Sequence, residues 1–170
     1  NKKIKHFVAK MLKSGEEGYI SQKERGYMVL VHFHPPDALA IPSKADLVTE
    51  TCEAAVFDGE KEEYSLNPIS MVGHVSSEQI TLFCFQSKGV NREDSFARAE
   101  MMWDTIRARV HKKGGPYVVE NLPKVVAEIM KESKGYNAKI VRFRTKREYH
   151  REIKKLENFE FLAKYDWWTD

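Results

Sequence analysis

The chain has 170 residues, 42% hydrophobic and 31% charged, with a net charge of +3, which is the balance of a globular domain rather than a disordered tail. Its longest apolar run, residues 27–33, is far shorter than the roughly 20 residues that cross a bilayer, and no signal-peptide core opens the sequence, so we expect no membrane partner. Two cysteines among apolar neighbours, Cys52 and Cys84, favour reduced thiols in a cytoplasmic protein over a secreted disulfide scaffold.

The periodicity of apolar residues, with capping and turn residues between the periodic segments, predicts most of the secondary structure. In chain order the predicted elements are a helix over 3–13, strands over 18–22 and 27–33, a helix over 44–57, a hairpin of strands 69–75 and 80–85, helices over 94–113 and 122–134, and a strand over 138–144. Strands that alternate with helices indicate an α/β fold, a mixed β-sheet flanked by helices. Because residues 27–33 are apolar throughout, we expect them to form a central strand.

Positive charge gathers in the last third of the sequence. Residues 105–155 include 15 lysine and arginine residues against 5 acidic ones. Such a stretch indicates either solvated helix faces or a surface for an acidic protein partner or nucleic acid. We therefore divide the chain into a domain over 1–115 and a basic C-terminal α+β extension over 116–170, which is either separate or part of the same domain.

The most informative residues follow the apolar strand 27–33. His32 and His34 are two positions apart, so in an extended strand both imidazoles lie on one face. Proline at positions 35 and 36 cannot continue a sheet, so the chain must leave it there and return through a loop to Ser43 and Asp46 at a helix start. Two histidines and a carboxylate, His32, His34 and Asp46, are the ligand set of a catalytic zinc site.

These residues resemble the signature of the JAMM metalloproteases, the catalytic MPN domains, which is His-x-His-Pro, a short loop and Ser-x-x-Asp. The matching segments are His32-Phe33-His34-Pro35 and Ser43-Lys44-Ala45-Asp46. The resemblance covers residues 3–88 and implies a JAMM/MPN (cytidine-deaminase-like) fold over the first domain. It implies that the two histidines and Asp46 bind Zn²⁺, and that Ser43 stabilises the oxyanion. The alternative for Ser43 is a helix N-cap only.

In the JAMM family a glutamate upstream of the zinc ligands acts as the general base. Glu16 matches best, because it follows the first predicted helix and precedes a glycine and an apolar segment, and Glu17 is the alternative. A third choice is a residue upstream of Asn1. The resemblance implies that the chain is a zinc-dependent hydrolase of peptide or isopeptide bonds. Its substrate would be a protein or peptide, and conjugates of ubiquitin-like or sulfur-carrier proteins are among the candidates.

Two other functions remain open. One is a catalytically inactive JAMM-like scaffold that binds a partner, although retention of both histidines, Ser43 and Asp46 argues for an enzyme. The other is a Mg²⁺-dependent nuclease, since Asp58, Gln86 and Lys88 resemble the Asp…Gln-x-Lys variant of PD-(D/E)XK nucleases. Zinc content separates the metalloprotease from the nuclease, because the nuclease would need added Mg²⁺ instead.

Overall fold

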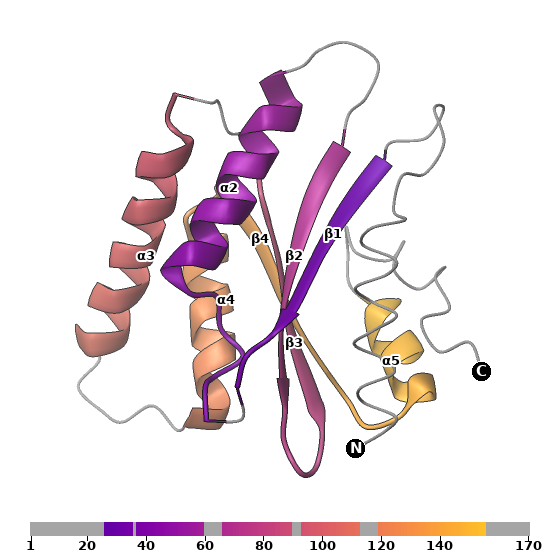
Figure 1. The fold of residues 1–170 in the computed structure, drawn as a ribbon. Coiled ribbons are helices and arrows are strands. Elements are labelled where there is room, and N and C mark those ends of the chain that lie inside the picture. Colours follow the sequence, from indigo (N-terminus) through magenta and orange to yellow (C-terminus); the bar gives the residue numbers. More distant parts are fainter. Residues whose placement is uncertain (1–25, 36, 60–65, 90–92, 113–118, 156–170) are drawn as a thin grey trace.

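A computed structural model of the chain describes residues 26–35, 37–59, 66–89, 93–112 and 119–155 (Figure 1). In these residues four strands form one mixed sheet in the order β1-β2-β3-β4, with β1 over Gly26–Phe33, β2 over Leu66–Val75, β3 over Ile80–Ser87 and β4 over Tyr136–Phe143. β1 and β2 are parallel, whereas the other neighbours are antiparallel. Parallel strands need a crossover connection, and helix α2 (Lys44–Gly59) supplies it.

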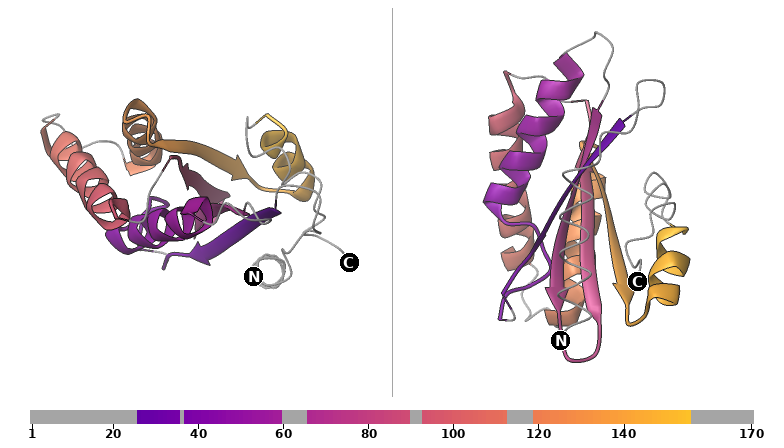
Figure 2. Two further views of the ribbon diagram at one scale, coloured as in Figure 1. Left: turned by 90° about the horizontal axis from the view of Figure 1, so that it is seen from above. Right: turned by 45° about the vertical axis from the view of Figure 1, so that its right-hand side comes forward.

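Helices cover both faces of this sheet (Figure 2). On one face lie α2, α3 (Ser95–Lys112) and α4 (Leu122–Glu132), and the short 3₁₀ helix η1 (Val119–Asn121) precedes α4. On the opposite face lies α5 (Lys146–Ile153), which packs on β4. The described chain is therefore an α/β fold with a mixed sheet between helices, as the alternation of elements predicts.

Each face of the sheet has its own buried apolar layer. Between the sheet and α2, α3 and α4 the layer includes Leu47, Phe83, Phe85, Met102 and Met130. On the other face Tyr149 of α5 sits edge-on against Phe143 of β4, with 5.1 Å between ring centroids, and Tyr149 and Ile153 are fully buried. β4 contributes to both layers, because successive residues of a strand point to opposite faces.

Seven of the predicted elements lie among the described residues, and all seven form with ends shifted by a few residues at most. The predicted helix 3–13 and strand 18–22 lie outside the described residues. β1 is an outer strand of the described sheet; the segment predicted as the preceding strand is not described, so the central position stays a prediction. The boundary at residue 115 also stays a prediction, although β4 from the second part pairs with β3.

Helix α5 is an element that the apolar periodicity does not predict. Its start is a variant of the capping box: the Thr145 hydroxyl oxygen accepts the Glu148 N–H at 3.2 Å, and a Glu148 carboxylate oxygen accepts the N–H of Arg144, the residue before the N-cap, at 2.7 Å. This Thr-x-x-Glu pattern is a sequence signal for a helix N-terminus. This pattern could have predicted the start of α5 from the sequence.

No helix among the described residues is long and apolar enough to cross a membrane. Both cysteines are free, with Cys84 buried in β3 and Cys52 half-buried in α2. Burial raises the pKa of the Cys84 thiol to about 12, so this thiol is protonated and unreactive at neutral pH.

Glu50 joins α2 to the inner strands of the sheet. Its side chain is fully buried, and its two carboxylate oxygens accept hydrogen bonds from the Ser70 hydroxyl of β2 at 2.6 Å and from the Ser87 N–H of β3 at 3.2 Å. Buried carboxylates are stable only when hydrogen-bonded. One side chain therefore fixes α2 against two strands, and α2 carries Asp46 one turn earlier.

We expect Glu50→Ala to lower the free energy of unfolding by about 3 kcal/mol, because the donors on β2 and β3 lose their acceptor inside the protein. The exposed neighbour Thr49 on the same helix offers a matched control, since surface substitutions usually change stability by about 0.5 kcal/mol or less. Urea denaturation of both variants gives the comparison. Equal stability of the two would contradict the bridging role of Glu50.

Candidate metal centre

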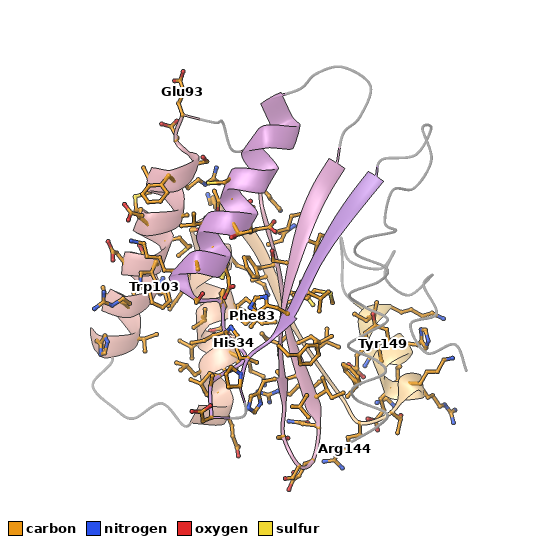
Figure 3. All side chains as sticks on the ribbon, in the orientation of Figure 1. His34, Phe83, Glu93, Trp103, Arg144 and Tyr149 are labelled. Carbon is orange, nitrogen blue, oxygen red and sulfur yellow. The ribbon has the colours of Figure 1, made fainter. Side chains whose placement is uncertain are left out.

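Three side chains come together at the carboxyl end of β1, close to the point labelled His34 in Figure 3. His32 Nε2 lies 3.2 Å from His34 Nε2 and 3.1 Å from Asp46 Oδ1. His34 Nε2 lies 3.6 Å from Asp46 Oδ2. The structure therefore brings the three predicted metal ligands into one cluster, although Asp46 is 12 positions beyond His34 in the sequence.

The two histidines point the same way because the chain stays extended to the end of β1. The His34 N–H donates to the Gly73 carbonyl of β2 at 2.9 Å, which continues the pairing of β1 with β2 for one more residue. Pro35 cannot donate such a bond, and its carbonyl accepts the Ala38 N–H in a turn at 3.0 Å. The loop then returns the chain to the start of α2, beside the histidines.

Ser43 and Asp46 cap α2 reciprocally. The Ser43 hydroxyl oxygen accepts the Asp46 N–H at 3.2 Å, and Asp46 Oδ2 accepts the Ser43 N–H at 2.7 Å. This is a capping box, with Ser43 at the N-cap and Asp46 three residues later. The N-cap alternative for Ser43 is thus present in the structure. The same bonds turn Oδ1 of Asp46 toward His32.

His34 is oriented by the loop. Its Nδ1 lies 2.8 Å from the Leu39 carbonyl oxygen, and because a carbonyl can only accept, Nδ1 carries the hydrogen. In the neutral ring Nε2 then keeps its lone pair and faces the cluster. Ligating histidines in metal sites commonly have such a partner, which sets the tautomer and the ring plane. The sequence contains no signal for this contact, because any residue has a carbonyl.

The spacing of the donor atoms is compatible with a small tetrahedral cation. Ligand atoms bound at about 2 Å to a tetrahedral zinc ion lie about 3.3 Å apart, and the two imidazole nitrogens are 3.2 Å apart. Their nearest Asp46 oxygens are Oδ1 at 3.1 Å from His32 and Oδ2 at 3.6 Å from His34. The His32 side chain is 43% exposed, whereas the His34 and Asp46 side chains are 18% and 15% exposed. The cluster is thus held from the protein side and open to solvent beside His32.

The environment of Asp46 favours its ionised form. Burial alone would raise the pKa of this carboxyl, but hydrogen bonding to His32 and to Ser43 outweighs burial and lowers the pKa from 3.8 to about 2. Its place in the first turn of α2 acts in the same direction, since helix N-termini favour negative charge. Asp46 is therefore a carboxylate at neutral pH, which is the state that a metal ligand requires.

The structure does not show where the predicted general base lies. Glu16 and Glu17 lie outside the described residues, so the choice of general base stays a prediction. Within the described ranges the cluster contains only His32, His34 and Asp46. Buried Glu50, which the sequence analysis missed, contacts Ser70 and Ser87 instead. A carboxylate one turn after Asp46 on the same helix was the available signal for it.

The residues of the predicted nuclease motif lie at the other end of the sheet. β3 runs opposite to β1, so Gln86 and Lys88, at and after the end of β3, are remote from the histidines. Gln86 is half-buried and Lys88 is exposed. Asp58 belongs to the last turn of α2, and its side chain is outside the described residues. The nuclease hypothesis therefore concerns a separate region and stays untested.

The basic last third is divided between the two sides of the sheet. α3 lies on one side and α5 on the other (Figure 2). Some of these cations already pair with acidic residues, such as Arg109 with Glu132 and Lys155 with Glu152. A partner surface would therefore be formed by only part of residues 105–155, and an acidic or nucleic-acid partner stays a prediction.

Comparisons with known proteins found no match to this chain. No model of a protein family, no curated protein and no solved structure matches the chain. What can be said of the site therefore comes from its own geometry and from the motif.

We expect Ser43→Ala to lower the free energy of unfolding of the metal-free protein by about 1 kcal/mol, because the Asp46 N–H loses its N-cap acceptor. Ser43→Thr keeps a hydroxyl and should retain most of this stability. Chemical denaturation in the presence of a chelator measures both. If Ser43→Ala is as stable as the unmodified chain, the hydroxyl does not cap α2 in solution.

Proposed function

We propose that the chain is a zinc-dependent hydrolase that cleaves peptide or isopeptide bonds. The observation that supports this most strongly is the convergence of His32, His34 and Asp46, each of which offers one donor atom within 4.8 Å of the other two. These residues also match the JAMM signature in type and order.

The donor set favours zinc over other common cations. Two imidazole nitrogens and one carboxylate oxygen suit the borderline character of Zn²⁺, whereas Mg²⁺ and Ca²⁺ prefer oxygen ligands alone. The described part of the chain supplies three ligands, and a site with three protein ligands is typical of catalytic rather than structural zinc, since structural sites use four. The exposed edge of His32 leaves the cluster accessible to water and to a substrate carbonyl.

When bound at this site, zinc would supply Lewis acidity, which polarises a carbonyl and lowers the pKa of water toward 7. The protein residues would do the remaining work. Glu16, or else Glu17, would take the proton of the attacking water and pass it to the leaving amine. The Ser43 oxygen accepts the Asp46 N–H, so its own hydrogen can be donated to the oxyanion of the substrate. Capping and oxyanion stabilisation are therefore compatible.

Metal content is the first test. Purified protein should contain one equivalent of zinc by elemental analysis, and His34→Ala and Asp46→Ala should each lose it, because two ligands bind zinc far more weakly than three. His111→Ala, an exposed histidine on α3, should keep the full equivalent. Absence of zinc binding by the unmodified chain would contradict the proposal, and Mg²⁺-dependent DNA cleavage would then favour the nuclease.

The second test addresses catalysis. Glu16→Gln should keep the zinc and the fold while hydrolysis falls on the order of 10²- to 10⁴-fold, because the amide cannot accept the proton of water. The assay uses a panel of glycine-terminated conjugates and peptides, with Glu17→Gln as the matched variant. Loss of activity in Glu17→Gln alone would move the base by one residue. A chain that binds zinc and cleaves nothing in the panel would favour the binding scaffold.

A further inference from the structure

Gly73 of β2 and Phe33 of β1 are direct partners across the parallel pair. The Phe33 ring lies over the glycine so closely that a β-carbon at position 73 would be 2.5 Å from Cε1, 2.7 Å from Cδ1 and 2.8 Å from Cζ of the ring. Carbon atoms that are not bonded normally approach to about 3.5 Å. The contact therefore exists only because residue 73 has no side chain.

The same glycine also holds the backbone at the metal ligands. Phe33 lies between His32 and His34 in the sequence, so its ring points to the face of the sheet opposite the imidazoles. The Gly73 carbonyl accepts the His34 N–H at 2.9 Å. The ring contact and the backbone hydrogen bond thus both hold the end of β1 against this single residue of β2.

A side chain at position 73 would be hard to accommodate by ring rotation. Rotation about the Cβ–Cγ bond leaves Cζ in place, because this atom lies on the rotation axis, and Cζ would still be 2.8 Å from the new carbon. Relief then requires a different χ1 or movement of the β1 backbone. Either change acts on the residue between the two histidines.

We infer that Gly73 is a positioning residue for the candidate metal centre. By admitting the Phe33 ring against β2, it sets how closely the end of β1 approaches β2, and so sets where His32 and His34 stand relative to Asp46. Glycine within a strand commonly marks such a close approach, and an aromatic residue on the neighbouring strand commonly covers it. The inference rests on the proposed zinc site.

The test is a double-mutant cycle on zinc affinity, measured by competition with a chromophoric chelator. Gly73→Ala should weaken zinc binding on the order of 10- to 100-fold, as is usual when a residue that orients metal ligands is changed. In a Phe33→Ala background the same change should have an effect of less than about 3-fold, because the ring that the new methyl group meets is gone.

Gly135→Ala provides the matched control. A β-carbon there would meet the Arg98 guanidinium, but Gly135 precedes β4 at the end of the sheet away from the histidines. It should lower stability, measured by denaturation with chelator present, and leave zinc affinity unchanged. A loss of affinity equal to that of Gly73→Ala would show a general effect of destabilisation and overturn the inference.

The other possible results also distinguish the positioning role of Gly73 from the zinc site itself. Unchanged zinc affinity in Gly73→Ala, or an equally large effect with and without the Phe33 ring, overturns the positioning role while the zinc site stands. If Gly73→Ala does not fold, the Phe33→Ala/Gly73→Ala protein should fold and bind zinc like Phe33→Ala, and failure of this protein to fold overturns the inference. No zinc binding by the unmodified chain removes the proposed function itself.

Discussion

The hydrogen bonds exchanged by Ser43 and Asp46 at the first turn of α2 determine where the candidate metal centre lies. A parallel β1–β2 pair needs a crossover, so α2 must begin near the carboxyl end of β1 and run back along the sheet. That topology places the first turn of α2 beside the histidines. The capping box then selects, among the rotamers of Asp46, one that faces His32, with Oδ2 held by the Ser43 N–H at 2.7 Å.

Local rules were enough to predict the cluster from sequence. The two-residue periodicity of a strand, the inability of proline to donate and the preference of serine for the N-cap each act within a few residues. Together they place both imidazoles on one face of the strand and Asp46 in the first turn of the next helix, and the crossover from β1 to β2 then brings Asp46 beside them. The boundaries of most helices and strands follow from similar local signals, and the Thr145 capping box shows that α5 could have been found in the same way.

Contacts between distant segments were not predictable in this manner. Glu50 meets Ser70 and Ser87, 20 and 37 positions away, and nothing in the sequence pairs a helical glutamate with particular serines. The same holds for the Phe33 ring over Gly73, which depends on the register of β1 against β2. These contacts fix α2 and the end of β1 to the sheet. The ligands are thus specified locally, whereas their support is specified by the tertiary fold.

The hydrogen-bonding chemistry of the cluster explains why a cation suits it. With the His34 Nδ1 hydrogen directed to Leu39, neutral His34 offers only a lone pair at Nε2, and the facing Asp46 oxygens are acceptors as well. The close approach of His32 Nε2 to both groups therefore requires a hydrogen on that nitrogen, shared between two acceptors at 3.2 and 3.1 Å. A divalent cation can satisfy all three lone pairs together, which one hydrogen cannot. The orientation imposed by Leu39 and Ser43 thus assembles acceptors whose mutual repulsion a bound metal ion would relieve.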